Sequence, residues 1–301
     1  MLKKILMTGS NGLLGQKITD ILRYHTEYEL IATSKGENRY PKEGGYIYEN
    51  LDITNPLELE RIMAKYEPYA VINTAAMTNV DQCESDKENC DLLNIKAVEY
   101  LTKSCTKYNV YLVHLSTDFI FDGEAGPYKE DDEAKPLSYY GRSKWEAEKI
   151  IMNSSLDYSI LRTIIVYGVA AKMSRSNIVL WAKSALEKGD NIKVVNDQYR
   201  MPTLAEDLAK ACILAIDKRA KGVYHISGKD YMSVIEMVKR IAKFYNLDES
   251  LIQETDSSTL NQAAKRPART GFVLDKAIKE LGYAPHSFEE GLAVVAKQLQ
   301  Q

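Results

Sequence analysis

The chain has 301 residues, of which 45% are hydrophobic, and a formal net charge of −3 at pH 7. This length can bury one large core, or one core and a smaller lobe, without help from disulfides or metals. The small negative charge argues against a nucleic-acid-binding protein, because such proteins use a basic face to neutralise phosphates.

The amino-terminal residues become glycine-rich before any long apolar run develops. We therefore expect no signal peptide, no membrane-spanning segment and a cytoplasmic location. The cysteines form no Cys-x-x-Cys pair and have no histidine at metal-ligand spacing, which predicts reduced packing residues rather than a zinc site. These cysteines are Cys83, Cys90, Cys105 and Cys212.

Short β-rich apolar runs alternate with helical patterns in the first half of the chain. This rhythm predicts a parallel sheet covered by helices on both faces, as in a Rossmann-type, doubly wound α/β fold. Asn55 and Pro56 support one helix start, because Asn caps a helix and Pro suits its first position. The predicted strands span residues 5–8, 30–33, 70–73, 111–115 and 158–163.

The pattern becomes less regular after residue 165, with helices expected at 177–187, 205–216 and 234–245 and a strand at 192–195. We predict an NAD(P)-binding Rossmann domain over residues 1–165. Residues 166–301 are expected to form mainly a smaller α+β substrate-binding lobe, with room for one strand or helix to return to the first domain.

The first strand runs into a glycine-rich turn that contains Gly9, Gly12 and Gly15. Glycines there allow the tight turn, let the backbone approach a pyrophosphate and let the helix pack on the strand. The helix start presents unpaired N–H groups to the anion. Glycines in a loop often serve a turn alone, but the position at the first strand of a parallel sheet favours a dinucleotide site.

The end of the second strand bears on the choice of cofactor. A carboxylate there binds the ribose 2′-OH, whereas this chain has Ser34 and Lys35, which favour NADPH. Glu37 and Arg39 lie nearby, so NADH stays open. Further along, before the strand at 70–73, Asp52 either accepts from an adenine amino group or belongs to the turn that enters a helix, and both roles are compatible.

Tyr140 and Lys144 lie four residues apart in a helical pattern, so both face one side of the helix. A Lys ammonium beside a phenol stabilises phenolate and should lower the tyrosine pKa. With 20 tyrosines, about one such pair arises by chance. The strand 111–115 ends near Thr117, at the sheet edge where ligands bind, and its hydroxyl can donate to a substrate carbonyl.

Four segments resemble the dTDP-4-dehydrorhamnose reductases among the extended short-chain dehydrogenases. They are residues 73–81 followed by Glu84, residues 116–123, residues 196–198 with 202–203, and residues 266–267. The resemblance implies hydride transfer to C4 of a keto-sugar nucleotide, with Tyr140 as proton donor and Lys144 on the nicotinamide ribose. Thr117 and Asp118 would contact the sugar nucleotide, and Asn94 would organise the site. The implied cofactor contacts are Gly12, Leu13, Leu14, Ser34, Asp52, Ile53, Ala76, Met77, Thr78, Tyr140 and Lys144.

Arg266 either clamps the nucleotide diphosphate, since its guanidinium matches phosphate oxygens, or is a solvated surface residue. Two positions depart from the family pattern: Phe119 replaces a usual Tyr, and Ile165 replaces a frequent Trp. Some members bind magnesium through a Glu near the glycine turn. Gln16 and Lys17 follow Gly15 here, so we expect no metal.

Two other classes of function remain open. One is a sugar-nucleotide epimerase or dehydratase that keeps NAD bound, although Ser34 and residues 196–198 favour the reductase. The other is a regulatory subunit such as the beta subunit of methionine adenosyltransferase, which resembles the same reductases. The partners we expect are a small nucleotide sugar and at most a second copy of the chain, with no nucleic acid and no membrane.

Overall fold

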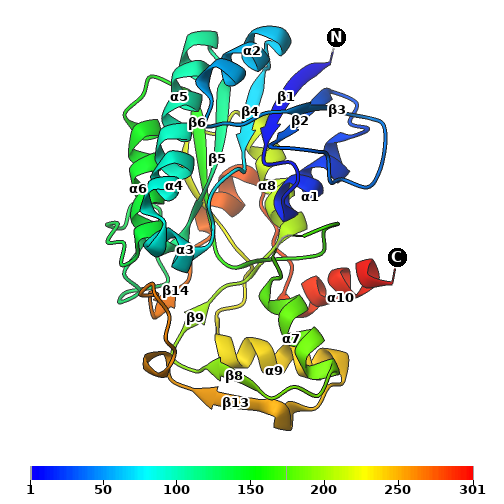
Figure 1. Ribbon diagram of the computed structural model, residues 1–301, viewed down its shortest axis with the longest axis vertical. Coiled ribbons are helices and arrows are strands. Elements are labelled where there is room, and N and C mark those ends of the chain that lie inside the picture. Colours follow the sequence, from blue (N-terminus) through cyan, green and yellow to red (C-terminus); the bar gives the residue numbers. More distant parts are fainter. Residues whose placement is uncertain (1, 174, 301) are drawn as a thin grey trace.

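The computed structural model describes residues 2–173 and 175–300, and its larger body is built around one parallel sheet (Figure 1). This sheet has seven strands in the order β11-β6-β5-β4-β1-β2-β3. All five predicted strands lie in it, which confirms the Rossmann-type α/β class. The bounds are β1 Lys3–Thr8, β2 Tyr28–Ser34, β3 Ile47–Asn50, β4 Ala70–Asn73, β5 Tyr111–Thr117, β6 Tyr158–Thr163 and β11 Gly222–Ile226.

Helices cover both faces of the sheet because each strand is apolar on both sides. One face packs against α1 (Leu13–Leu22) and α8 (Ala205–Asp217), and the other against α2 (Pro56–Tyr66), α5 (Ala97–Tyr108) and α6 (Tyr139–Met152). The predicted start of α2 is confirmed: the Asn55 side chain accepts from the N–H groups of Leu57 and Glu58.

A smaller lobe lies below the sheet in Figure 1 and has its own apolar core. Its main helices are α7 (Ile178–Glu187), α9 (Val234–Tyr245) and α10 (Phe288–Leu299), with β8 (Ile192–Val195) paired to β13 (Ile252–Thr255). Two-residue strands form two further small sheets: β7 (Val166–Tyr167) with β10 (Thr203–Leu204), and β9 (Tyr199–Arg200) with β12 (Met232–Ser233) and β14 (Arg269–Thr270).

The chain crosses between the two bodies more than once. After β10 it returns to the large sheet through α8 and β11, and only then forms β12 and α9. The predicted domain boundary at residue 165 stays a prediction. Chain order alone does not separate the two bodies, because α8 and β11 follow residue 165 and belong to the large body.

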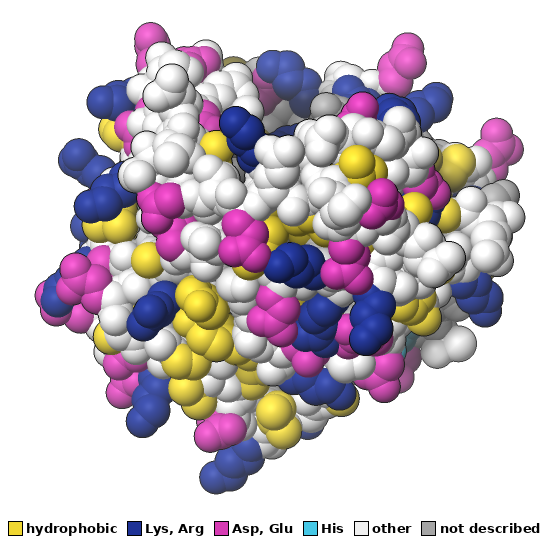
Figure 2. Space-filling model, turned by 90° about the horizontal axis from the view of Figure 1, so that it is seen from below, with side chains coloured by type: hydrophobic (Ala, Val, Ile, Leu, Met, Phe, Trp, Pro, Cys, Tyr) yellow, Lys and Arg dark blue, Asp and Glu magenta, His cyan; other side chains and the backbone are white. Residues whose placement is uncertain are grey.

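The view from below looks onto the smaller lobe, where basic and acidic side chains are interspersed (Figure 2). The face shown offers no continuous basic surface. Within residues 2–173 and 175–300, no helix is both long and apolar enough to cross a membrane.

Candidate active site

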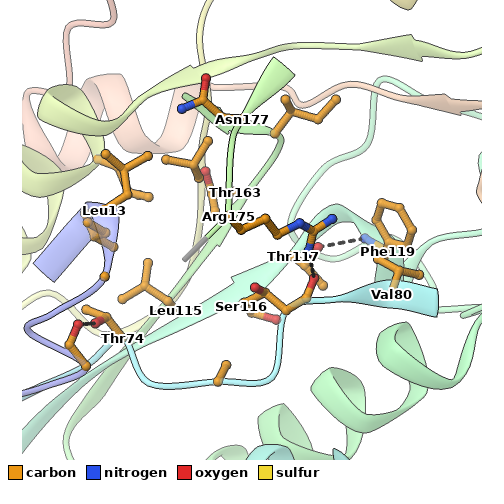
Figure 3. A pocket seen from close by; sticks show the side chains of 18 of the residues that line it. Leu13, Thr74, Val80, Leu115, Ser116, Thr117, Phe119, Thr163, Arg175 and Asn177 are labelled. Carbon is orange, nitrogen blue, oxygen red and sulfur yellow. Dashed lines mark hydrogen bonds between the residues drawn. The ribbon is translucent and has the colours of Figure 1, made fainter. Parts of the chain in front are cut away.

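A cavity of about 680 Å³ lies at the carboxyl edge of the large sheet, where parallel α/β folds bind their ligands. Its walls come from the glycine turn after β1, the loop after β4, the end of β5 and the start of α6. Segments of the smaller lobe close the opposite side (Figure 3). The predicted site residues that line it are Gly9, Gly12, Leu13, Leu14, Ala76, Thr78, Thr117, Asp118, Tyr140, Lys144 and Arg266.

The glycine turn is packed too tightly for side chains. A Cβ on Gly9, whose φ is +71°, would lie 2.6 Å from Thr74 Oγ1, and one on Gly15 would lie 2.4 Å from the Gly9 carbonyl oxygen. Gly12 begins α1 without a side-chain cap, which leaves N–H groups of the first turn open toward the cavity. The buried Ser10 hydroxyl has no hydrogen-bond partner in the protein. This turn suits a phosphate group.

The remaining predicted cofactor contacts do not line the cavity. Ser34 ends β2, and Lys35 beside it forms a 2.7 Å ion pair with Asp52. The Asp52 carboxylate also accepts from the N–H and hydroxyl of Thr54, so its helix-entry role is present. Ile53 is buried in the core below α2.

Asn94 holds the loop after β4, as the resemblance implied. It lies in a π-helical turn, Leu92–Lys96. Its side-chain oxygen accepts from Met77 N at 2.8 Å, and its amide nitrogen donates to Met77 O and to Ser143 Oγ, each at 3.0 Å. Met77 is buried against Tyr140. The loop that carries Ala76 and Thr78 is thereby tied to α6.

Thr117 and Tyr140 meet at the floor of the cavity. Thr117 ends β5, where its hydroxyl donates to Asp118 Oδ1 at 3.1 Å, and Tyr140 lies in the first turn of α6. Burial raises the pKa of Tyr140, and the neighbouring Thr117 hydroxyl acts in the opposite direction. The net direction is upward, so the expected depression of the tyrosine pKa is wrong here. Desolvation of the phenol outweighs its neighbours.

Lys144 is buried one turn further along α6. Its amine donates to the carbonyl oxygen of Leu115 at 2.6 Å and lies 3.2 Å from His114 Nε2. Burial lowers the pKa of Lys144 from 10.5 to about 8. The amine is therefore still mostly charged at neutral pH, but it can lose its proton more easily than an exposed lysine.

Asp118 is held inside the protein. Its carboxylate accepts from the hydroxyls of Thr117 and Thr270, and it lies 3.8 Å from Arg200 Nε. Burial raises the pKa of Asp118, and the Arg200 guanidinium opposes that rise. The group therefore joins β5 to β9 and β14 as well as facing the cavity.

Arg266 already has a protein partner. Two of its nitrogens contact the Asp81 carboxylate, at 3.2 and 2.7 Å, and Ala264 N donates to the same group. The arginine still lines the cavity. Its predicted contact with a diphosphate would be made by a guanidinium that Asp81 holds in place.

Several residues that line the cavity were not predicted from the sequence. Arg200 is buried and donates to the carbonyl oxygens of Tyr199 and Pro267, each at 2.7 Å. Arg175 reaches over Ser116 and Thr117 from the smaller lobe (Figure 3), and it donates to Thr78 O at 3.3 Å. The motif around 196–203 could have pointed to Arg200. No local signal marks Arg175, because its partner is almost one hundred residues away.

Both departures from the family pattern lie in the cavity wall. Phe119 packs edge-on against Tyr140, with ring centroids 5.8 Å apart. Ile165 has a φ of +35°, which is unusual for a β-branched residue, and its carbonyl accepts from Thr203 N at 3.1 Å. These two side chains therefore shape the part of the cavity opposite the glycine turn.

No metal-binding group of three or more His, Cys, Asp or Glu side chains occurs in the described residues. Gln16 exchanges two hydrogen bonds with the backbone of Ala171, both at 2.9 Å. Lys17 pairs with Glu206 at 2.9 Å. The two residues after Gly15 thus connect α1 to the segment after β7 and to α8.

The fold and this site together have the organisation of the extended short-chain dehydrogenase/reductase class. The family model described as "RmlD substrate binding domain" matches residues 3–301, and the chain belongs to this family.

Curated relatives include both biosynthetic proteins and a subunit of a larger enzyme. The spore coat polysaccharide biosynthesis protein SpsK of Bacillus subtilis is 31% identical over 290 residues, covering 96% of this chain and 95% of the relative. The methionine adenosyltransferase 2 subunit beta of Xenopus tropicalis is 28% identical over 254 residues, covering 82% of this chain and 74% of the relative.

Two solved structures described as dTDP-4-dehydrorhamnose reductases share the fold over nearly the whole chain. That of Clostridium acetobutylicum has a TM-score of 0.87 and 29% identity and covers 99% of this chain and 100% of its own. That of Bacillus anthracis, solved in complex with NADP, has a TM-score of 0.84 and 25% identity, with the same coverage.

Proposed function

We propose that this protein reduces the C4 ketone of a nucleotide-linked deoxysugar with NADPH, with dTDP-4-dehydro-L-rhamnose as the first substrate to test. The observation that carries the proposal is the convergence of Thr117, Tyr140 and Lys144 on one cavity beside the glycine turn. Reductases of this name among the similar structures support the choice of sugar.

In this proposal, one end of the cavity binds the cofactor pyrophosphate and the other holds the ketone and the proton donor. The glycine turn and the start of α1 would hold the cofactor pyrophosphate. When bound, the nicotinamide supplies the hydride. Tyr140 would donate its proton to the ketone oxygen, and Lys144, one turn further along α6, would bind the nicotinamide ribose and return a proton to the phenolate. Thr117 would hydrogen-bond the same ketone oxygen.

The charge of the cavity wall favours an anionic substrate. Arg175, Arg200 and Arg266 line it together with Lys144, against a single lining carboxylate, Asp118. A nucleotide diphosphate carries the complementary charge, and guanidinium groups match phosphate oxygens in a bidentate way. We expect Arg175 and Arg266 to contact the diphosphate, because Arg200 is committed to backbone carbonyls.

The choice of NADPH over NADH rests on the end of β2. Ser34 replaces the carboxylate that would bind a ribose 2′-OH, and the Lys35 side chain is 81% exposed. The relative crystallised with NADP supports this preference. We expect NADH to work less well, because the contact to a 2′-phosphate would be lost.

The second candidate is a regulatory subunit, favoured by the similarity to the beta subunit of methionine adenosyltransferase 2. A third is an NAD-retaining epimerase or dehydratase. Purified protein that carries stoichiometric NAD would favour the third. A stable complex with a larger enzyme, without reduction of any ketone, would favour the second.

The test is a spectrophotometric assay at 340 nm. The purified protein is mixed with NADPH or NADH and dTDP-4-dehydro-L-rhamnose, and separately with other keto-sugar nucleotides. We expect rapid NADPH oxidation that depends on the sugar. No oxidation with any keto-sugar, although NADPH binds, would contradict the proposed reduction.

A further inference from the structure

A row of buried polar side chains crosses the large sheet near its carboxyl edge. Thr8 of β1 is the register partner of Asn73 in β4, and Asn73 is the register partner of His114 in β5. Each is at most 1% exposed. Two positions earlier, the residues that point to the same face are apolar and fully buried: Leu6, Val71 and Leu112. The sheet interior thus changes from apolar to polar at this level.

The row forms a continuous chain of contacts that ends on Lys144. Thr8 Oγ1 lies 2.5 Å from Asn73 Oδ1, Asn73 Nδ2 lies 3.0 Å from His114 Nδ1, and His114 Nε2 lies 3.2 Å from Lys144 Nζ. Buried polar groups without partners are costly, so such a row persists when each member bonds the next. Its last member is the amine that faces the cavity.

His114 is a neutral ring in this position. Burial, aided by the charge of Lys144, holds the pKa of His114 well below its usual 6.5. A neutral imidazole has one nitrogen that donates and one that accepts. Facing a charged ammonium, Nε2 accepts and Nδ1 carries the proton toward Asn73. This tautomer requires the Asn73 amide to turn its oxygen to the ring and its nitrogen to Thr8, and the 2.5 Å contact with Thr8 would then lengthen to an N–H···O distance.

The other surroundings of Lys144 leave its amine little freedom. Leu115 O takes one N–H at 2.6 Å. Glu148, one turn further along α6, is bound by Arg162 of β6 at 2.7 Å, and Cys90 of α4 is the remaining titratable neighbour that acts on the amine. With one N–H on Leu115 O and one on His114, the third N–H has a fixed direction, and Lys144 lines the cavity.

We propose that His114, held by Asn73 and Thr8, is a positioning residue that fixes the Lys144 amine for its work in the cavity. The inference rests on the proposed function for the identity of the group that the third N–H meets, but its geometry is independent of the substrate. His114 acts through Lys144, so its loss should change rate and lysine titration together rather than stability alone.

Three variants separate positioning from a structural role. His114→Leu removes both ring nitrogens, and His114→Gln keeps an amide that can accept from Lys144. His225→Leu is the matched control, because His225 is an equally buried histidine, stacked on Phe272 at 3.9 Å and absent from the cavity wall. We expect both leucine variants to lose thermal stability. His114→Leu alone should lose about tenfold or more in kcat at an unchanged KM for the sugar, and His114→Gln should recover most of it.

A second readout needs neither substrate nor cofactor. The ¹³Cε resonance of Lys144, assigned by its absence in Lys144→Arg, is followed with pH. Loss of an acceptor disfavours the buried ammonium, so the pKa of Lys144 should fall by about one unit in His114→Leu. The Lys144 pKa should move much less in His225→Leu, because His225 reaches the lysine only through Arg162 and Glu148.

The two readouts distinguish the failures. If the wild-type protein reduces no keto-sugar, the proposed function fails, and the lysine titration still decides the role of His114. An unchanged Lys144 titration in His114→Leu overturns the positioning role. So does a wild-type kcat in that variant when the wild-type protein is active.

Discussion

Burial acts in opposite senses on the two side chains that we assign to proton transfer. It raises the pKa of Tyr140 and lowers that of Lys144 to about 8, because in both cases the charged form loses water. At neutral pH the phenol keeps its proton, as a general acid must. The lysine loses its proton more readily than usual, so a proton can pass from its amine to a newly formed phenolate.

Replacing Tyr140 tests this assignment. Tyr140→Phe removes the transferred proton and leaves the ring, so we expect cofactor binding to persist while kcat falls by about 10²–10⁴. The measurement is steady-state ketone reduction together with NADPH binding by fluorescence. Tyr139→Phe is the matched control, since that hydroxyl bonds Asp91 at 2.8 Å. Equal activity in both variants would remove Tyr140 from the mechanism.

The buried charge of Lys144 should carry a stability cost. Its pKa in the folded protein, about 8, lies below the ordinary 10.5, so the folded state binds the proton more weakly than the unfolded chain. The cost is full below about pH 8 and disappears as the pH rises to about 10.5. The difference between the two pKa values corresponds to about 3 kcal/mol in the free energy of unfolding.

Lys144→Met removes this cost together with the amine. We therefore expect the variant to be more stable at pH 7, by up to about 3 kcal/mol less the value of the lost hydrogen bonds, and inactive. Denaturant unfolding at pH 7 and pH 10 measures it, and the advantage should shrink at the higher pH. An advantage that grows with pH would show that the lysine is not destabilised by burial.

Residues whose role depends on local spacing could be predicted from the sequence, and those whose role depends on distant partners could not. Tyr140 and Lys144 are four apart on one helix, so the shared face follows from helix geometry. From the sequence alone, His114 is one residue of a predicted buried strand. Its proposed role depends on contacts with Asn73 and Lys144, which are 41 and 30 residues away.

At the scale of elements, the start of α6 sets the position of Tyr140, the proposed proton donor. Ser138 caps the helix by accepting from Gly141 N, and a Cβ on Gly141 would lie 2.1 Å from the carbonyl oxygen of Phe119. The helix therefore touches the chain that leaves β5. This contact brings Tyr140 close to Thr117.

Gly141→Ala should push α6 away from β5. We expect a loss of about 1–3 kcal/mol in the free energy of unfolding and a fall in kcat of about tenfold or more, because backbone must move. Arg142→Ala, at the neighbouring exposed position, should change neither by much. Thermal unfolding and the ketone-reduction assay check both variants. If Gly141→Ala matches Arg142→Ala, the close approach does not control the site.

Five of the seven large-sheet strands were predictable because each contains a buried apolar run bounded by turn residues. The sequence did not give ranges for β3, which is only partly buried, or for β11. The predicted helix at 234–245 coincides with α9, where Ser233 caps the amino-terminal end and Asn246 ends the helix in a left-handed conformation. The two-residue strands β7, β9, β10, β12 and β14 could not be predicted. Each consists of two residues, and their pairing partners lie far away in the sequence.

At the scale of the whole molecule, the cavity is lined by segments of both bodies, because the chain passes between them more than once. The glycine turn, Thr117 and the start of α6 belong to the larger body, whereas Arg175, Arg200 and Arg266 come from segments that follow β6. A ligand that spans both walls should stabilise the folded protein as a unit. The sequence predicted a dinucleotide end, a sugar-nucleotide end and Arg266 as a candidate clamp, but not Arg175 or Arg200.

Cofactor should therefore raise the melting temperature. At a concentration one hundred times its Kd, NADPH should add about 2.7 kcal/mol to the stability, and NADH at the same concentration should add less. Differential scanning fluorimetry measures the rise in melting temperature. In Lys35→Ala, the rise with NADPH should come closer to the rise with NADH. An equal shift with NADH would contradict the role assigned to the end of β2.

The most direct test of the central claim is isotopic. The protein is incubated with NADPH that carries deuterium at C4 of the nicotinamide ring and with dTDP-4-dehydro-L-rhamnose, and the product is examined by mass spectrometry and NMR. We predict net formation of NADP⁺ and one deuterium at C4 of the product sugar, absent with Tyr140→Phe. A sugar that is rearranged without net cofactor oxidation, or one that is unchanged while NADPH is bound, would contradict the reductase account.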